Sequence, residues 1–245
     1  CPNHAGDQMN GYILKPTNFD PSKRYPVVMS QYSGPGSQSV LDKWTIDWEY
    51  YLVSKGFIVA CVDGRGTGGR SRAYETSVYM QLGKLETEDQ VAGAEYMRTL
   101  PYVDDKHIGI YGWSYGGYET LMAMSTSNGT YQAGVAIAPV TDWRYYDTIY
   151  AERFMRTPNE NNEGYEQSAP ITHAEKLKGD LLIISGTADD NVHYLNTLQY
   201  SAALIEAGIQ FDTQIYTNKD HHIRGCNTRH HLYTKVCNFF LDKLK

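Results

Sequence analysis

Apolar runs of strand length alternate with helix-like stretches along most of the chain, and glycine, proline, asparagine and aspartate separate them. Apolar or β-rich runs predict strands within residues 11–24 and at 25–32, 57–62, 108–111, 133–138, 181–185 and 211–216. Helix patterns cover 42–55, 87–100, 118–124, 193–207 and 228–244. Strands and helices that alternate at this spacing are typical of βαβ units. We therefore expect an α/β fold with a mostly parallel central sheet and helices on both faces.

Residues 141–170 depart from this alternation. The segment is rich in tryptophan, tyrosine, arginine and asparagine, and it follows the predicted strand at 133–138. α/β proteins place their ligand sites in such excursions beyond the carboxyl edge of the sheet. The glycine-rich run at 63–70 also follows a strand, but it lacks both G-K-[ST] and a G-x-G-x-x-G that opens a helix. We interpret that run as a flexible structural loop rather than a phosphate site.

The stretch at 108–119 reads I-G-I-Y-G-W-S-Y-G-G-Y-E and joins a predicted strand to a predicted helix through a serine. Residues 112–116 fit G-x-S-x-G, with Ser114 at the centre. Strand, glycine-flanked serine and helix are the parts of a nucleophile elbow, which exposes the serine hydroxyl at the top of an α/β-hydrolase sheet. The alternative is an ordinary Gly-Ser turn. We expect an α/β-hydrolase fold in which Ser114 is the nucleophile.

Acidic and histidine residues follow the last two predicted strands. A serine hydroxyl is a poor nucleophile without a base that takes its proton and a carboxylate that orients the base. In this fold the chain order is serine, acid, histidine. Asp189 or Asp190 follows the next-to-last strand, and His221 or His222 follows the last. Such groups at three strand ends, in this order, favour a catalytic triad.

Two donors to the developing oxyanion are also predicted. One is the backbone N–H of Tyr115, the residue after the nucleophile. The other must come from the loop after an early strand, where Q-Y-S-G-P-G offers the side chain of Tyr32.

Composition and charge narrow the function only slightly. The 245-residue chain has 41% hydrophobic and 20% charged residues, as a globular domain does, and its net charge of −6 disfavours nucleic acid and an anionic membrane surface as partners. No apolar run approaches the roughly 20 residues that span a bilayer. The four cysteines have neither zinc-ligand nor C-x-x-C spacing, and a bond between Cys226 and Cys237 stays open. The sequence implies no metal and no cofactor.

Several longer motifs resemble those of a known family. G-W-S-Y-G-G-Y, Y-S-G-P, D-G-R-G-T-G, G-T-A-D-D-N-V-H and P-V-T-D-W-R-Y-Y-D-T-I-Y-A-E-R-F-M are together similar to the catalytic domain of dipeptidyl peptidase IV-like serine peptidases, in the prolyl oligopeptidase family. The resemblance extends from about residue 11 to the C-terminus. It implies that Ser114 is the nucleophile, Asp189 the orienting carboxylate and His221 the general base.

The same resemblance implies a substrate site. Tyr32 and the Tyr115 N–H would form the oxyanion hole, and Asn191 would bind the carbonyl of the substrate's penultimate residue. A box of aromatic rings and valines would hold the proline ring: Tyr115, Val140, Trp143, Tyr146, Tyr150 and Val192. Two positions depart from the family pattern. His222 stands where the family has glycine, and Ala133 stands where it has a disulfide cysteine, so that bridge should be absent.

The activity that the resemblance implies is that of a serine exopeptidase, which cleaves peptides after a penultimate proline or alanine and releases dipeptides. We expect residues 1–245 to be a single catalytic domain, the C-terminal part of a longer protein whose N-terminal β-propeller is absent here. The longer protein is expected to be extracytoplasmic and homodimeric, with 228–244 in the dimer contact. The alternatives are another oligopeptidase such as an acylaminoacyl peptidase, an esterase of the same fold, and a catalytically silent binding relative.

Overall fold

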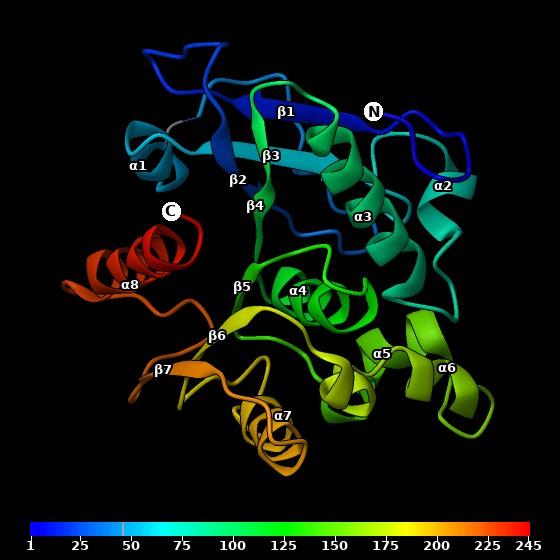
Figure 1. Ribbon diagram of the computed structural model, residues 1–245. Helices are drawn as coiled ribbons and strands as arrows, with labels where there is room; N and C mark the ends of the chain where they lie inside the picture. Colours follow the sequence, from blue (N-terminus) through cyan, green and yellow to red (C-terminus); the bar gives the residue numbers. More distant parts are fainter. Residues whose placement is uncertain (46) are drawn as a thin grey trace.

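A seven-stranded sheet runs through the middle of the molecule (Figure 1). The computed structural model describes residues 1–45 and 47–245. The strand order is β1-β3-β2-β4-β5-β6-β7; β1 pairs antiparallel with β3, and the other neighbouring pairs are parallel, which confirms the predicted sheet. The strands are β1 (Asn10–Leu14), β2 (Tyr25–Ser30), β3 (Ile58–Asp63), β4 (Val103–Trp113), β5 (Ala133–Ile137), β6 (Asp180–Gly186) and β7 (Asp212–Tyr216).

Helices cover both faces of the sheet, with α1 and α8 on one face and α3, α4 and α7 on the other (Figure 1). Along β2, Val28 packs into the layer that contains α1 and α8, whereas Val27 and Met29 pack into the opposite layer. A strand buried on both faces needs apolar residues at every position, which explains its continuous apolar run. The helices are α1 (Glu49–Ser54), α2 (Arg72–Thr76), α3 (Lys84–Arg98), α4 (Tyr115–Thr126), α5 (Thr148–Met155), α6 (Asn162–Gln167), α7 (Leu195–Glu206) and α8 (Thr228–Lys243), with 3-10 helices η1 (Trp143–Tyr145) and η2 (Pro170–Lys176).

The helix predicted first along the chain is much shorter than expected. It covers only Glu49–Ser54; the residues before it are not helical where the structure describes them, and Ile46 lies outside the described residues. The Asp47 carboxylate accepts the Trp48 N–H at 2.7 Å, a local bond that competes with helical pairing. The predicted end of the helix is confirmed, because Gly56 follows it with a φ of +84°.

The other differences lie in short helices and helix starts. α3 begins three residues before the expected start at residue 87, directly after Gly83, which has a φ of 79°. The short helix α2 was not predicted. Most of the 141–170 excursion folds into η1, α5 and α6, which pack beside α4 (Figure 1). These elements are too short for a clear helical period, so the surrounding tertiary contacts decide them.

The glycine-rich loop at 63–70 is tied to the rest of the domain by polar contacts. The Asp63 carboxylate accepts the N–H groups of Ser39 and Val40. The Arg65 guanidinium contacts the Asp89 carboxylate at 2.7 Å. The loop therefore links β3 to α3 as a structural element.

All four cysteines have free thiols, so the bond between Cys226 and Cys237 that the sequence left open does not form. None of the helices in the described part of the chain combines the length and apolar character that spanning a bilayer requires.

Candidate active site

Ser114 lies at the sharp turn between β4 and α4. Its backbone has φ 61° and ψ −116°, a strained conformation for a residue with a side chain. The Ser114 N–H donates to the Ile137 carbonyl at 2.8 Å, which anchors the turn to β5. A Cβ atom on Gly112 would collide with the Gly116 carbonyl, and one on Gly116 would lie 2.6 Å from the Gln31 carbonyl oxygen. Both glycines of the motif are therefore required by close packing, as the predicted elbow demands.

The ends of β6 and β7 bring a carboxylate and an imidazole together. His221 Nδ1 lies 2.7 Å from Asp189 Oδ2, and both side chains are buried. The other carboxylate oxygen, Asp189 Oδ1, accepts the backbone N–H groups of Asn191 and Val192, each at 2.9 Å. These bonds fix the carboxylate, and the carboxylate in turn fixes the imidazole.

The sequence left Asp190 as an alternative to Asp189 and His222 as an alternative to His221. Both alternatives are exposed, so burial distinguishes the two members of each pair. His222 stands where the family pattern has glycine, and its φ is not positive. The positive φ in this turn, 46°, belongs instead to Ile223. A histidine at position 222 is therefore compatible with a buried His221.

Trp113 connects the elbow to the histidine loop and was not singled out by sequence reasoning. Its indole Nε1–H donates to the His221 carbonyl at 3.0 Å. The Arg229 guanidinium lies 4.6 Å from the indole ring and covers it. The sequence does contain an indication of this role, because an aromatic residue with an N–H donor directly precedes Ser114.

The loop after β2 brings two polar side chains to the elbow. Gln31 is buried, and its Nε2 donates to the Gly116 carbonyl at 2.8 Å, a contact that no local pattern of residues predicts. The Tyr32 side chain is 38% exposed, but partial loss of water around its hydroxyl raises the pKa of the phenol, and the Ser114 side chain beside it opposes part of that rise. The Tyr32 hydroxyl thus stays protonated and is available as a donor beside Ser114.

The side chains predicted to hold the proline ring belong to one apolar cluster. Tyr115, Val140, Trp143 and Val192 are buried together, and the rings of Tyr146 and Tyr150 pack against them. The Trp143 ring centroid lies 5.5 Å from that of Tyr115, 5.9 Å from that of Tyr146 and 5.8 Å from that of Tyr150. All six side chains that the resemblance named for this pocket therefore lie together.

Asn191 joins this cluster through a side-chain contact. The Tyr146 hydroxyl donates to Asn191 Oδ1 at 2.7 Å. Both residues also line an open cavity of about 700 Å³, together with Asp147 and Asp190. The exposed amide of Asn191 is thus held beside the apolar cluster by Tyr146.

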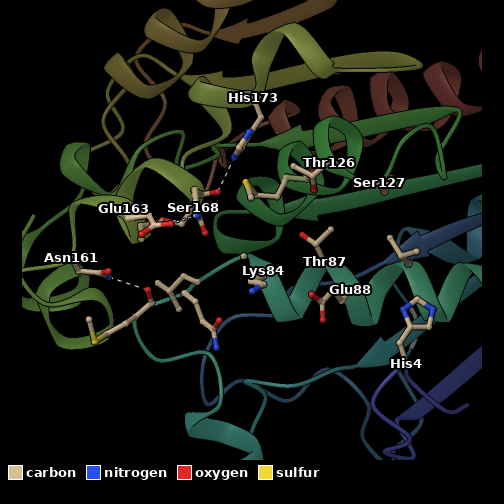
Figure 2. Close-up of a pocket in the computed structure, with 18 of the residues that line it drawn as sticks. His4, Lys84, Thr87, Glu88, Thr126, Ser127, Asn161, Glu163, Ser168 and His173 are labelled. Carbon is tan, nitrogen blue, oxygen red and sulfur yellow. Dashed lines mark hydrogen bonds between the residues drawn. The ribbon is translucent and has the colours of Figure 1, made fainter.

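A second cavity, of about 670 Å³, has a different lining, in which Leu82 and Met122 belong to the same apolar cluster (Figure 2). Lys84, Thr87 and Glu88 project into it from α3, and His173 flanks it on the opposite side (Figure 2). Among the described residues, no group of three or more histidine, cysteine, aspartate or glutamate side chains is arranged to hold a metal ion.

Comparison with known proteins gives one consistent result. A sequence profile of the prolyl oligopeptidase family matches residues 44–245. Dipeptidyl peptidase 4 of Sus scrofa is 41% identical over 231 residues, which are 93% of this chain and 30% of that protein. A probable dipeptidyl-aminopeptidase B of Metarhizium robertsii is 41% identical over 242 residues, which are 97% of this chain and 26% of that protein.

The crystal structure of Porphyromonas gingivalis dipeptidyl peptidase 4 superimposes with a TM-score of 0.97 at 55% identity, over 99% of this chain and 35% of that one. This chain thus spans about a quarter to a third of the length of the relatives it matches.

Proposed function

The chain belongs to the prolyl oligopeptidase family, and on this premise we propose that it is the catalytic domain of a serine peptidase of the dipeptidyl peptidase type. The observation that carries the proposal is the 2.7 Å contact between His221 Nδ1 and Asp189 Oδ2, formed at the ends of neighbouring strands. A serine at an elbow, a buried imidazole and a buried carboxylate are the groups that acyl transfer needs.

In the proposed reaction, Ser114 Oγ attacks the carbonyl carbon of the scissile amide. Asp189 accepts the Nδ1–H of His221, so the unprotonated Nε2 takes the serine proton. The same imidazole gives this proton to the leaving amine as the C–N bond breaks, and water then hydrolyses the acyl-enzyme by the reverse sequence. The Tyr32 hydroxyl and the Tyr115 N–H donate to the oxyanion.

The apolar cluster supports a preference for proline at the position before the cleaved bond. A pyrrolidine ring is compact, apolar and lacks an N–H, so rings and valines recognise it by shape and by loss of water. The cluster around Trp143 has this chemistry. Asn191, held by the Tyr146 hydroxyl, would donate to the carbonyl of the penultimate substrate residue.

Release of dipeptides requires a further element that binds the free amino terminus of the substrate two residues before the cleaved bond. We assign this role to the family's N-terminal β-propeller in the full-length protein. The homodimer, with α8 in its contact, and the extracytoplasmic location likewise rest on the family resemblance. The chain alone is therefore expected to have weak or no dipeptidase activity.

Parallel assays test the proposal. The isolated chain should hydrolyse Gly-Pro-p-nitroanilide far more slowly than a full-length relative or not at all, and Ser114→Ala should abolish any hydrolysis that the chain shows. Preferential hydrolysis of short acyl esters with no response to proline would favour the esterase alternative instead. Turnover of Gly-Pro-p-nitroanilide equal to that of a full-length relative would contradict the need for the propeller.

A further inference from the structure

A buried carboxyl group lies directly behind the apolar cluster. Glu86, in the first turn of α3, is only 1% exposed. The Tyr115 hydroxyl donates to Glu86 Oε1 at 2.7 Å. Lys84, Thr87 and Glu88 of the same helix line the cavity in Figure 2, whereas Glu86 is not part of that lining. Glu86 thus points into the domain.

The bond to Glu86 acts on a ring that is central to the cluster. The Tyr115 ring centroid lies 5.5 Å from that of Trp143, 5.1 Å from that of Tyr118 and 6.1 Å from that of Tyr32. A phenol ring can rotate and tilt about its side-chain torsions unless its polar end is held. Glu86 holds that end, so it sets the position of one wall of the pocket without contacting a substrate.

We propose that Glu86 is a positioning residue for substrate specificity, which fixes the Tyr115 ring against the ring of a bound proline; this inference rests on the proposed function. The elbow backbone is anchored separately, by the bond from the Ser114 N–H to the Ile137 carbonyl, so the acyl-transfer machinery should keep its geometry when the Glu86 contact is lost. Glu86 therefore governs binding of the proline ring more than the chemical step.

The charge state of Glu86 determines the strength of its hydrogen bond with the Tyr115 hydroxyl. Burial raises the pKa of Glu86 to about 7, although backbone amides and the Tyr115 hydroxyl favour its charged form. An ionised carboxylate is the stronger hydrogen-bond acceptor, so the ring is held best above that pH. The titratable groups that act on Glu86, or on which it acts, are Asp89 of α3, Tyr115, Tyr118 and Glu119 of α4, and Tyr150 of α5.

Binding of a non-cleavable ligand tests the proposal. Alanyl-pyrrolidide carries the proline-like ring without a scissile bond, and alanyl-dimethylamide is the matched ligand without the ring. By titration calorimetry at pH 8, Glu86→Gln should weaken binding of the pyrrolidide about tenfold and binding of the dimethylamide less than twofold. When the pH is lowered below 7, the affinity of the wild type for the pyrrolidide should decrease more than the affinity of Glu86→Gln does.

Three further measurements complete the test. Glu88→Gln, on the same helix but directed at Arg65, should leave binding unchanged. Tyr115→Phe removes this bond, whereas Glu86→Gln replaces its charged acceptor by a neutral one. Tyr115→Phe should therefore weaken binding at least as much as Glu86→Gln does, and the double variant should bind no more weakly than Tyr115→Phe, because both substitutions act on the same contact. Hydrolysis of p-nitrophenyl acetate, which needs no proline pocket, should stay within about threefold of wild type in Glu86→Gln.

The outcomes separate the two proposals. Equal pyrrolidide affinity in wild type, Glu86→Gln and Tyr115→Phe overturns the role of Glu86 alone. Pyrrolidide binding without ester hydrolysis in the wild type overturns the catalytic proposal and leaves the role of Glu86 standing. A wild-type chain that binds the pyrrolidide no better than the dimethylamide overturns the proline pocket, and the role of Glu86 with it.

Discussion

Tyr32 brings a phenol to Ser114 from the end of a neighbouring strand, since β2 and β4 are adjacent in the sheet. Tyr32→Phe removes the proposed side-chain donor to the oxyanion and should lower kcat about 10²- to 10³-fold. Tyr51→Phe removes an exposed phenol on α1 and should leave kcat unchanged. Steady-state kinetics on an activated ester provide the comparison, and a loss below tenfold in Tyr32→Phe would exclude the phenol from the oxyanion hole.

Single residues of the site were predictable to different degrees. Chain order and strand ends narrowed the acid and the base to two adjacent residues each, because a strand end fixes a position only to within a residue or two. Burial then selects Asp189 and His221. The contacts of Gln31 and Glu86 could not be predicted from the sequence. Gln31 bonds to Gly116 and Glu86 to Tyr115, and both partners are distant in the chain.

At the scale of elements, the end of β4 supports the loop after β7 through Trp113. Trp113→Phe keeps a ring but removes the donor to the His221 carbonyl, a bond worth about 1 kcal/mol. The histidine loop should become less fixed, so we expect kcat to fall roughly tenfold with a small loss of thermal stability. Trp48→Phe, in the α8-facing layer of the core, is the control. An unchanged kcat in Trp113→Phe would show that the loop is fixed by other contacts.

Strands were easier to predict than helix boundaries. β2, β3 and β6 are buried on both faces almost throughout, so their sequences are continuous apolar runs. The start of α3 depends on Gly83 in the left-handed region, which a hydrophobic period does not reveal. Tertiary packing and local side-chain bonds, such as that of Asp47, decide the remaining helix ends.

At the scale of the whole molecule, Glu86 couples stability to pH. Its pKa is raised in the folded chain, so the folded state holds a proton that the unfolded chain releases at lower pH. The stabilisation is complete below the unfolded pKa, about 4.5, and is lost as the pH rises through about 7. The free energy of unfolding of Glu86→Gln, relative to wild type, should therefore increase between pH 5 and pH 8. Urea unfolding at both pH values measures it, and a constant difference would contradict the raised pKa.

The alternation of strands and helices predicted the parallel sheet, but it did not predict the whole topology. β1 pairs antiparallel with β3, with Asn10 opposite Asp63, although the two strands are far apart in the chain. Pairing over such a distance depends on which segment of the chain adds to the free edge of the assembled sheet. A local pattern carries no information on that choice.

The central claim is that His221 activates Ser114 for nucleophilic attack. Labelling with a fluorophosphonate, followed by mass spectrometry, tests it without a peptide substrate, because an unactivated serine does not react. The account predicts modification of Ser114 in the wild-type chain, an equal rate in His222→Gln, and a rate lower by at least about 10³ in His221→Gln. Labelling of His221→Gln at the wild-type rate, or no labelling of the wild-type chain, would contradict it.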